Sequence, residues 1–375
     1  METEKQNEIN KNDLLHPIPL EIASVAGWKE VPLTECGEPL EAIGPFSDNP
    51  YDRIFTSSIY FGERNDSPYS RNQLEGALVT TFARREVANQ LIEAEELLPE
   101  GVHIMVMDSF RTLDVQGALY DNYLDSIRKQ RPDVKEEELS AETQKFVSIP
   151  STDPDKPSPH NTGGSIDVVL YQLPENIETR VNEINNLVSE MEDDASHVED
   201  IYKLEMERIG LIAQNAEMLD FGTKWDHGGP ESALNYFEVL AEERPLTEAE
   251  ENAKQNRRLL CNVMIAVGLE PYAEEYWHYN SKQSQMGAKT AGLDFAQYGA
   301  MELSPENLAH EQMRRNHLLG TEMLAQIPPE LLASLAGKNP PRHLRLAHEA
   351  AQDLDTRATS LPKAAVIEAP EKEAA

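Results

Sequence analysis

Hydrophobic and polar positions follow two different spacings along this chain, and the spacing changes where proline and glycine occur. From Arg71, apolar residues recur at nearly helical intervals until Pro99 and Gly101, which predicts a helix over that stretch. The dense apolar run at 102–108 is typical of a buried strand. Helical spacing then resumes until Pro132 ends it, because proline cannot continue a helix.

The second half of the chain predicts more helix than strand. A proline-rich loop at 151–164 leads into the apolar run 165–173, which predicts another strand. Helical spacing returns at 175–218 and is interrupted by "EDDAS", so we predict an inserted hairpin of two antiparallel helices. Two further helical patterns cover 246–268 and 301–358.

The two ends of the chain lack the pattern of a packed core. Residues 1–50 carry scattered prolines and no sustained period, which predicts an extended arm or a wrapped, irregular segment. Residues 359–375 have the composition of a disordered tail. We therefore expect one main domain at 51–300, followed by a helical extension at 301–358.

Composition narrows the classes of partner. The 375 residues suffice for a substantial core, and 67 acidic against 33 basic side chains give a net charge of −34. Such a field repels phosphate backbones, so nucleic acid is not an expected partner. Apolar runs fall far short of the roughly 20 residues that span a bilayer, and the N-terminus is polar and acidic where a secretory signal needs a basic start. We expect no membrane segment and a cytoplasmic location.

One loop carries candidate metal ligands. In "SPHNTGGSID", His160 and Asp167 lie seven positions apart around Gly163 and Gly164. The glycines allow the chain to fold back sharply, so that both side chains can converge on one ion. The alternative is an ordinary turn with a local hydrogen bond and a solvated imidazole, and the spacing alone does not decide between them.

A second candidate group is "EYWH", from Glu275 to His278. An imidazole among aromatic side chains is expected to be partly buried, where it needs a hydrogen-bond or metal partner. Glu275, three residues earlier, could share the same cavity. The alternative is a histidine satisfied by a neighbouring carbonyl, with Tyr276 and Trp277 filling core. His227 is the one other histidine close to a motif, and it could compete as a ligand.

Four motifs in order resemble those of the zinc D-alanyl-D-alanine dipeptidases, the family that includes the vancomycin-resistance D,D-dipeptidase. "SPHNTGGSID" matches SxHxxGxxxD, and "EYWH" matches ExWH. "DSFRTLDVQ" is similar to D-x-(Tyr/Phe)-R-x-x-x-x-Q, and "FGTKWD" is similar to a GTxFD loop. The resemblance covers about residues 50–280 and implies an α+β fold, with a zinc site on a small, mostly antiparallel sheet flanked by helices. The sequence pattern, which predicts few strands and many helices, agrees with this fold.

The resemblance also implies roles for individual side chains. Three of them would hold one Zn²⁺: His160, Asp167 and His278. Glu275 would be the general base that takes a proton from the zinc-bound water, and Arg111 would stabilise the oxyanion. Ser158 would bind the terminal carboxylate of a D,D-dipeptide, most of all D-alanyl-D-alanine, and Asp226 would bind its free ammonium. The alternative for Asp226 is a plain turn residue.

These residue types suit the implied chemistry. Two neutral imidazoles and one carboxylate leave a zinc site near +1, so the metal can still lower the pKa of bound water from about 15.7 toward roughly 7. A carboxylate base then moves the proton, and an always-protonated arginine stabilises the developing negative charge. An acidic side chain in the cleft would favour a free ammonium over the uncharged amide of a longer peptide.

The chain departs from the family pattern in places. Ser165 stands where alanine is usual. Our register puts Phe55 where the family has a tyrosine that helps to hold the substrate ammonium, which predicts one hydrogen bond fewer. The hairpin and the extension after residue 300 exceed the family core, and could form a lid, an oligomer surface or a docking site for another protein. Alternative functions are a D,D-carboxypeptidase or other cell-wall peptide hydrolase, or a catalytically weak zinc module acting through these helices.

Overall fold

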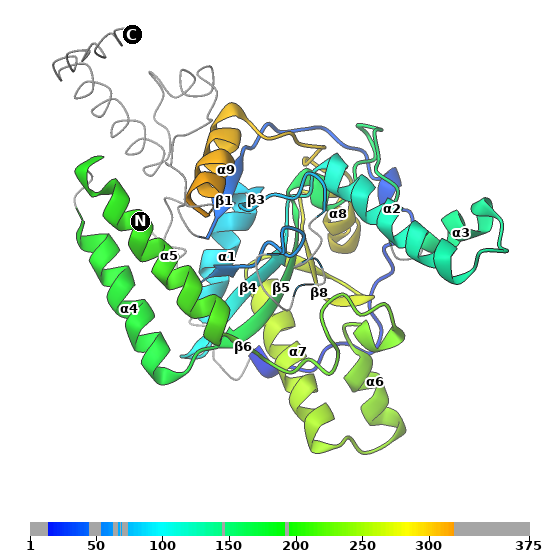
Figure 1. The fold of residues 1–375 in the computed structure, drawn as a ribbon. Helices are drawn as coiled ribbons and strands as arrows, with labels where there is room; N and C mark the ends of the chain where they lie inside the picture. The colour runs from blue at the N-terminus through cyan, green and yellow to red at the C-terminus, as the bar shows by residue number, and fades with distance from the viewer. Residues whose placement is uncertain are drawn as a thin grey trace, which may run out of the picture.

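The computed structural model describes residues 14–44, 54–62, 67, 69, 74–144, 147–191 and 195–318. The predicted α+β class is confirmed, since helices surround small sheets that are not closed (Figure 1). Within the described residues, the main sheet has six strands in the order β2-β4-β5-β8-β7, with β6 pairing with β5. Their bounds are β2 Phe55–Thr56, β4 Val102–Asp108, β5 Ser165–Gln172, β6 Glu217–Met218, β7 Leu269–Tyr272 and β8 Glu275–Ser281.

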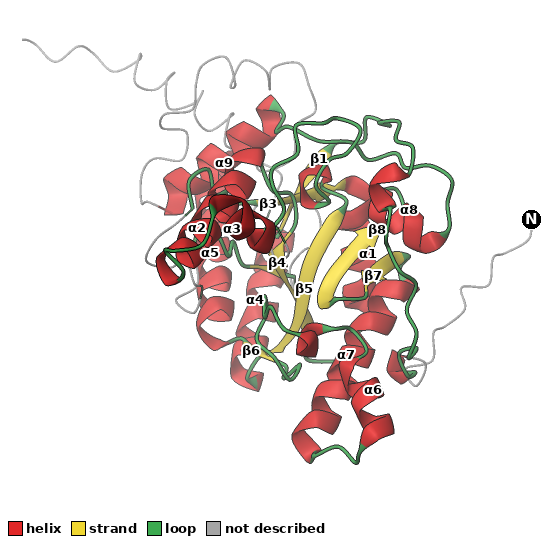
Figure 2. Cartoon of the chain, turned by 90° about the vertical axis from the view of Figure 1, so that its right-hand side faces the viewer, coloured by secondary structure: helices red, strands yellow, loops and turns green. Residues whose placement is uncertain are grey.

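The sheet is mostly antiparallel, as expected. Among the described strands of this sheet, only β2 pairs with its neighbour, β4, in parallel, whereas the other ladders are antiparallel. Figure 2 shows β4, β5, β8 and β7 side by side. The register places Asp167 of β5 opposite Asp108 of β4 on one side and opposite His278 of β8 on the other. Side chains directly opposite each other in antiparallel strands are close neighbours. Two carboxylates and an imidazole therefore share one row across the three central strands.

Helices α1 (Arg85–Leu97) and α7 (Glu248–Ala266) pack against each other and against the sheet. Thr247 starts α7 with a capping box, in which its hydroxyl accepts from the backbone of Glu250 and the Glu250 carboxylate accepts in return. The buried apolar residues of both helices join those of β4 and β5 in one large core. Strands β4 and β5 are buried almost along their whole length, which explains their dense apolar runs.

The helix predicted from Arg71 is wrong in its first half. Residues 81–84 form strand β3 (Thr81–Arg84), which pairs with β1 (Leu40–Ile43), and α1 begins only at Arg85. Branched side chains before Phe82 favour extended backbone, and the N–H groups of Val79 and Thr80 donate to the Glu311 carboxylate, 231 residues or more away. Tertiary partners thus outweigh a helical spacing of apolar residues.

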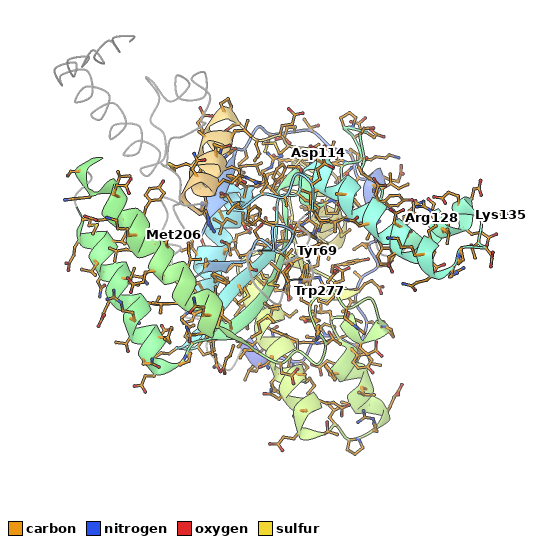
Figure 3. All side chains as sticks on the ribbon, viewed as in Figure 1. Tyr69, Asp114, Arg128, Lys135, Met206 and Trp277 are labelled. Carbon is orange, nitrogen blue, oxygen red and sulfur yellow. The ribbon has the colours of Figure 1, made fainter. Side chains whose placement is uncertain are left out.

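The predicted hairpin is present as α4 (Glu175–Glu190) and α5 (Val198–Asn215), which lie side by side at one edge of the molecule (Figure 1). Both helices contribute buried residues to the main core. On the opposite side, α2 (Leu113–Gln130) and α3 (Glu136–Thr143) project outward, with Arg128 and Lys135 marking their far end (Figure 3). The remaining helical segments are η2 Trp28–Glu30, η3 His160–Thr162, η4 Ala195–His197, η5 Pro230–Ser232, α6 Tyr236–Glu243, α8 Gln285–Ala291 and α9 Pro305–Leu318.

The two additions at the ends are partly built into the fold. Residues 14–44 wrap over the surface with little regular structure, and Leu14 and Ile18 enter the main core. Helix α9, the start of the predicted extension, also contributes to that core through Ala309 and Met313. Residues 319–358 and the predicted tail at 359–375 lie outside the described residues, and the division at residues 50 and 300 stays a prediction. Among the helices described, none combines the length and hydropathy needed to cross a bilayer.

Candidate metal centre and active site

The structure brings three of the proposed ligands together. His160, Asp167 and His278 are buried, and one ligand atom from each lies within 4.8 Å of the other two. His278 Nδ1 is 2.9 Å and His160 Nε2 is 3.6 Å from Asp167 Oδ1. His227 lies outside this cluster, because its exposed ring pairs with Glu231 instead. The seven-residue spacing therefore belongs to a compact group rather than to an isolated turn.

Local backbone geometry fixes the position of His160. It begins the short helix η3, which ends at Gly163 in the left-handed conformation, φ 68°. A larger residue at Gly163 would be strained in this conformation, and its Cβ would lie 2.4 Å from Leu40 Cδ2, so Leu40 would have to move. The turn is also tied from outside: the Arg84 guanidinium donates to Thr162 O at 2.7 Å, and the backbone N–H of Arg111 donates to His160 O at 3.1 Å.

Each imidazole has a hydrogen-bond acceptor on the nitrogen that faces away from the cluster. His160 Nδ1 lies 2.8 Å from Ser109 O, which assigns the proton to Nδ1 and leaves Nε2 facing Asp167. His278 Nε2 lies 3.2 Å from Asn280 Oδ1, and its Nδ1 faces Asp167. This is the arrangement in which histidines present a lone pair to a metal. Two imidazoles and one carboxylate also form a set that suits Zn²⁺ and leaves a coordination position open.

The protonation preferences of the cluster reflect its burial. Burial lowers the pKa of His160, so this ring favours the neutral form that a metal needs. Burial opposes charge on His278 as well, but the hydrogen bond to Asp167 and the negative charges of Asp167 and Glu275 together outweigh it and raise the pKa of His278. The two imidazoles likewise hold the pKa of Asp167 below its usual value despite burial. A proton on His278 Nδ1 is thus what an arriving cation would displace.

Asn280 is a site residue that the sequence reasoning missed. Its Oδ1 accepts from Ser165 Oγ at 2.7 Å, in addition to its contact with His278. Ser165 thus adds a hydrogen bond behind the cluster. The signal was available, because a residue two positions from a ligand on a strand points to the same face as that ligand.

Glu275 reaches the cluster through an irregularity in β8. Residues three apart on a regular strand point to opposite faces, yet Glu275 Oε2 lies 3.9 Å from His278 Nδ1. The pairing of β7 and β8 shifts here, since Pro271 is opposite Tyr279 but Tyr272 is opposite Glu275. Such a bulge re-aims side chains. Surrounding protein raises the pKa of Glu275 to about 7, although 39% of its side chain stays accessible to water.

Arg111 is held by hydrogen bonds to three neighbours, of which Asp108 and Gln116 belong to the same motif, "DSFRTLDVQ". Its Nε donates to Asp108 Oδ2 at 3.0 Å and its Nη1 to Gln116 Oε1 at 2.8 Å, while Nη2 donates to Tyr60 Oη at 2.7 Å and also to Asp108. Within the described part of the chain, these bonds occupy four of the five guanidinium N–H donors and leave one on Nη1. The ion pair with Asp108 outweighs burial and raises the pKa of Arg111.

The remaining predicted contacts lie on loops. Asp226 has an exposed side chain and a left-handed backbone, φ 61°. Protein on several sides and the negative charge of Asp167 raise its pKa to about 6. Ser158 is buried, and its hydroxyl has no hydrogen-bond partner within the described residues. A small pocket of about 30 Å³, enough for water, adjoins Arg111 and Tyr60.

The expectation that Phe55 stands at the substrate amine is wrong. Phe55 is 1% exposed and packs edge-on against Tyr171 in the core, with ring centroids 6.4 Å apart. Among the described residues of this segment, the tyrosine that reaches the site is Tyr60, five residues later, which contacts Arg111 and lies 3.3 Å from Asp108 Oδ2. The register failed because Phe55 and Tyr60 lie in one short segment, and only strand pairing shows which of them faces the core.

Comparison with known proteins agrees with the motifs. No protein-family model matches the chain. A D-alanyl-D-alanine dipeptidase from Synechocystis sp. is 21% identical over 264 residues, which cover 67% of this chain and 84% of that protein. The chain is therefore a distant relative of a protein that carries this name.

Proposed function

We propose that this chain is a zinc-dependent D,D-dipeptidase that hydrolyses D-alanyl-D-alanine to two molecules of D-alanine. The observation that carries the proposal is the buried cluster of His160, Asp167 and His278, in which both imidazoles have their outer nitrogen occupied. A carboxylate with a pKa of about 7, that of Glu275, stands beside it. The distant kinship with a D-alanyl-D-alanine dipeptidase supports the same reaction class.

In this proposal the metal ligands, Glu275 and Arg111 have different roles in the hydrolysis. Zn²⁺ bound by the cluster would supply a Lewis acid that makes water more acidic and polarises the scissile carbonyl. Glu275 Oε2 accepts the proton of the attacking water and returns it to the leaving amine nitrogen. The N–H of Arg111 Nη1 that makes no hydrogen bond to the described residues donates to the carbonyl oxygen as negative charge develops there. Asp108 and Gln116 hold the guanidinium so that this donor is already oriented.

Two groups recognise the ends of the substrate in this proposal. The Asp226 carboxylate pairs with the free ammonium. The hydroxyl of Ser158, which has no hydrogen-bond partner among the residues described, donates to the terminal carboxylate. A longer peptide offers an uncharged amide where the ammonium should be, so it loses the first contact. The cytoplasmic location, and a partner or second copy docking on the helical additions, stay predictions from the sequence.

The test is release of free D-alanine from D-Ala-D-Ala and from an N-acylated peptide ending in D-Ala-D-Ala. We expect release from the dipeptide alone, abolished by a chelator and restored by added Zn²⁺. Release from the longer peptide at a similar rate would indicate a carboxypeptidase instead. A zinc-loaded protein that cleaves neither substrate would rule out both enzymes and favour a binding module.

A further inference from the structure

The loop that carries Asp226 is tied at both ends to one buried arginine. Arg257 of α7 is 1% exposed. Its Nε and Nη2 donate to Phe221 O at 2.9 and 2.7 Å, before the loop. Nη2 also donates to Glu231 O at 2.8 Å, and Nη1 donates to Ala233 O at 2.6 Å, after it. The Arg257 guanidinium thus holds together the two ends of the loop segment 222–230.

Aromatic rings hold the guanidinium in place. The Arg257 Cζ lies 4.7 Å from the ring centroid of Phe237 and 4.5 Å from that of Tyr276. Tyr276 stacks on Phe221 with centroids 5.0 Å apart and 15° between planes, and its hydroxyl donates to Thr223 O at 3.2 Å. Tyr276 belongs to the same "EYWH" segment as Glu275, so the clamp is continuous with the strand that bears the cluster.

If Arg257 served only to fill space in the core, burying its charge would be energetically costly. In the part of the chain that the structure describes, Arg257 donates only to main-chain carbonyls and pairs with no carboxylate, and burial lowers its pKa to about 10. An apolar side chain would fill the same space without burying a charge. The arginine, unlike an apolar side chain, forms hydrogen bonds to three main-chain carbonyls at the same time. The loop needs such support, because Asp226 is a non-glycine residue in the left-handed region.

We propose that Arg257 is a positioning residue for substrate recognition, which closes the 221–233 loop and thereby holds Asp226 in place for the substrate ammonium. The inference rests on the proposed role of Asp226. Arg257 itself does not touch the substrate. It acts through the carbonyls of Phe221, Glu231 and Ala233, and its charge serves to orient those three groups.

The test is the Arg257→Lys variant of the full-length, zinc-loaded protein. Lysine keeps the charge but cannot span the three carbonyls. We expect KM for D-Ala-D-Ala to rise about tenfold with kcat nearly unchanged, and preference for the free over the N-acetylated dipeptide to fall by a similar factor. Backbone amides at 222–232 should exchange hydrogen faster, while those of β5 and β8 stay protected. Arg258→Lys, one position along α7, is the matched control, because Arg258 pairs with Glu238 and not with the loop.

A second variant guards against loss of folding. Tyr276→Phe removes one hydrogen bond to the loop and keeps the ring, so the same changes should appear at smaller size. Unchanged KM, preference and exchange in Arg257→Lys would overturn the proposal, and so would lower kcat and zinc content at constant KM. If the wild-type protein hydrolyses no dipeptide, the proposed function fails by itself. The exchange of the loop amides then still decides whether Arg257 holds the loop.

Discussion

Buried histidines occupy both ends of the main sheet, and their partners differ. At the start of β4, His103 places Nδ1 2.6 Å from Glu95 Oε1 and Nε2 3.0 Å from Glu178 Oε2. Burial opposes charge on this ring, but the two carboxylates outweigh it and raise its pKa. Both nitrogens are donors to carboxylates, so no lone pair is left for a metal. Here histidine joins α1 and α4 to the sheet.

At the other end of the same strands, the outer nitrogen of His278 meets the neutral acceptor Asn280 Oδ1. The outer nitrogen of His160 lies 2.8 Å from the neutral Ser109 O, with Asp108 Oδ2 farther away at 3.4 Å. All three histidines are buried to a similar degree, at 3%, 8% and 5% exposed. Burial therefore does not separate a ligand from an ion-paired histidine. The group that is hydrogen-bonded to the outer nitrogen does, because a neutral acceptor there fixes the tautomer and leaves the inner nitrogen available.

The largest effect is expected from removing the proposed base at the end of the sheet that carries the His160, Asp167 and His278 cluster. Glu275→Gln keeps the shape of the side chain but cannot accept a proton, so kcat for D-Ala-D-Ala should fall by about 10²- to 10⁴-fold. Zinc content should not change. Steady-state kinetics with metal analysis measure both, and Glu274→Gln, the exposed neighbour, is the control. Full activity in Glu275→Gln would remove it as the base.

The next effect tests the neutral acceptor behind His278. Asn280→Leu has similar size but no acceptor, so the tautomer of His278 is no longer fixed and zinc affinity should fall by about 10- to 100-fold. Competition with a chelator of known affinity measures it. Ser165→Ala, which removes only the added hydrogen bond to Asn280, should stay within about threefold of the wild type. Wild-type affinity in Asn280→Leu would mean that the outer partner does not matter.

A smaller effect concerns substrate recognition beside the cluster. Asp226 is charged above its pKa of about 6 and loses its charge as the pH falls below it. Bound Zn²⁺ would offset the charge of Asp167 and move this point lower. KM for the dipeptide should therefore be constant between about pH 6 and about pH 8 and rise below pH 6. Above about pH 8 the substrate amine loses its proton, and KM should rise again. Asp226→Asn should raise KM about tenfold and flatten the acid limb. An acid limb that persists in Asp226→Asn would assign it to another group.

The smallest effect belongs to the His103 end. A raised pKa in the folded state means that protonated His103 stabilises the protein fully below about pH 6.5, and that this stability is lost as the pH rises through the folded pKa. His103→Gln should lower the unfolding free energy by about 1 to 3 kcal/mol at pH 6 and by less at pH 8.5. Urea unfolding at both pH values measures the difference. Zinc affinity and KM should not change, and a loss of zinc would contradict the contrast between the two ends.

Part of the fold was predictable because its signals are local. The runs at 102–108 and 165–173 became β4 and β5, and the two helices of the hairpin lie where the spacing predicted them. The helix expected from Arg71 failed because strand pairing and the distant Glu311 satisfy its backbone instead. The candidate ligands were found through motif spacing, whereas the supporting residue Asn280 carried no motif in our reading.

The sequence by itself determined which side chains were available for a metal and a base, since glycine turns, strand alternation and motif order are properties of neighbouring residues. Only the tertiary structure decided how they are held. Tyr60 meets Arg111 across 51 positions, Ser165 meets Asn280 across 115, and Arg257 meets Phe221 across 36. These contacts depend on sheet register and on helix packing, which bring together segments that are far apart in the sequence and share no repeating pattern.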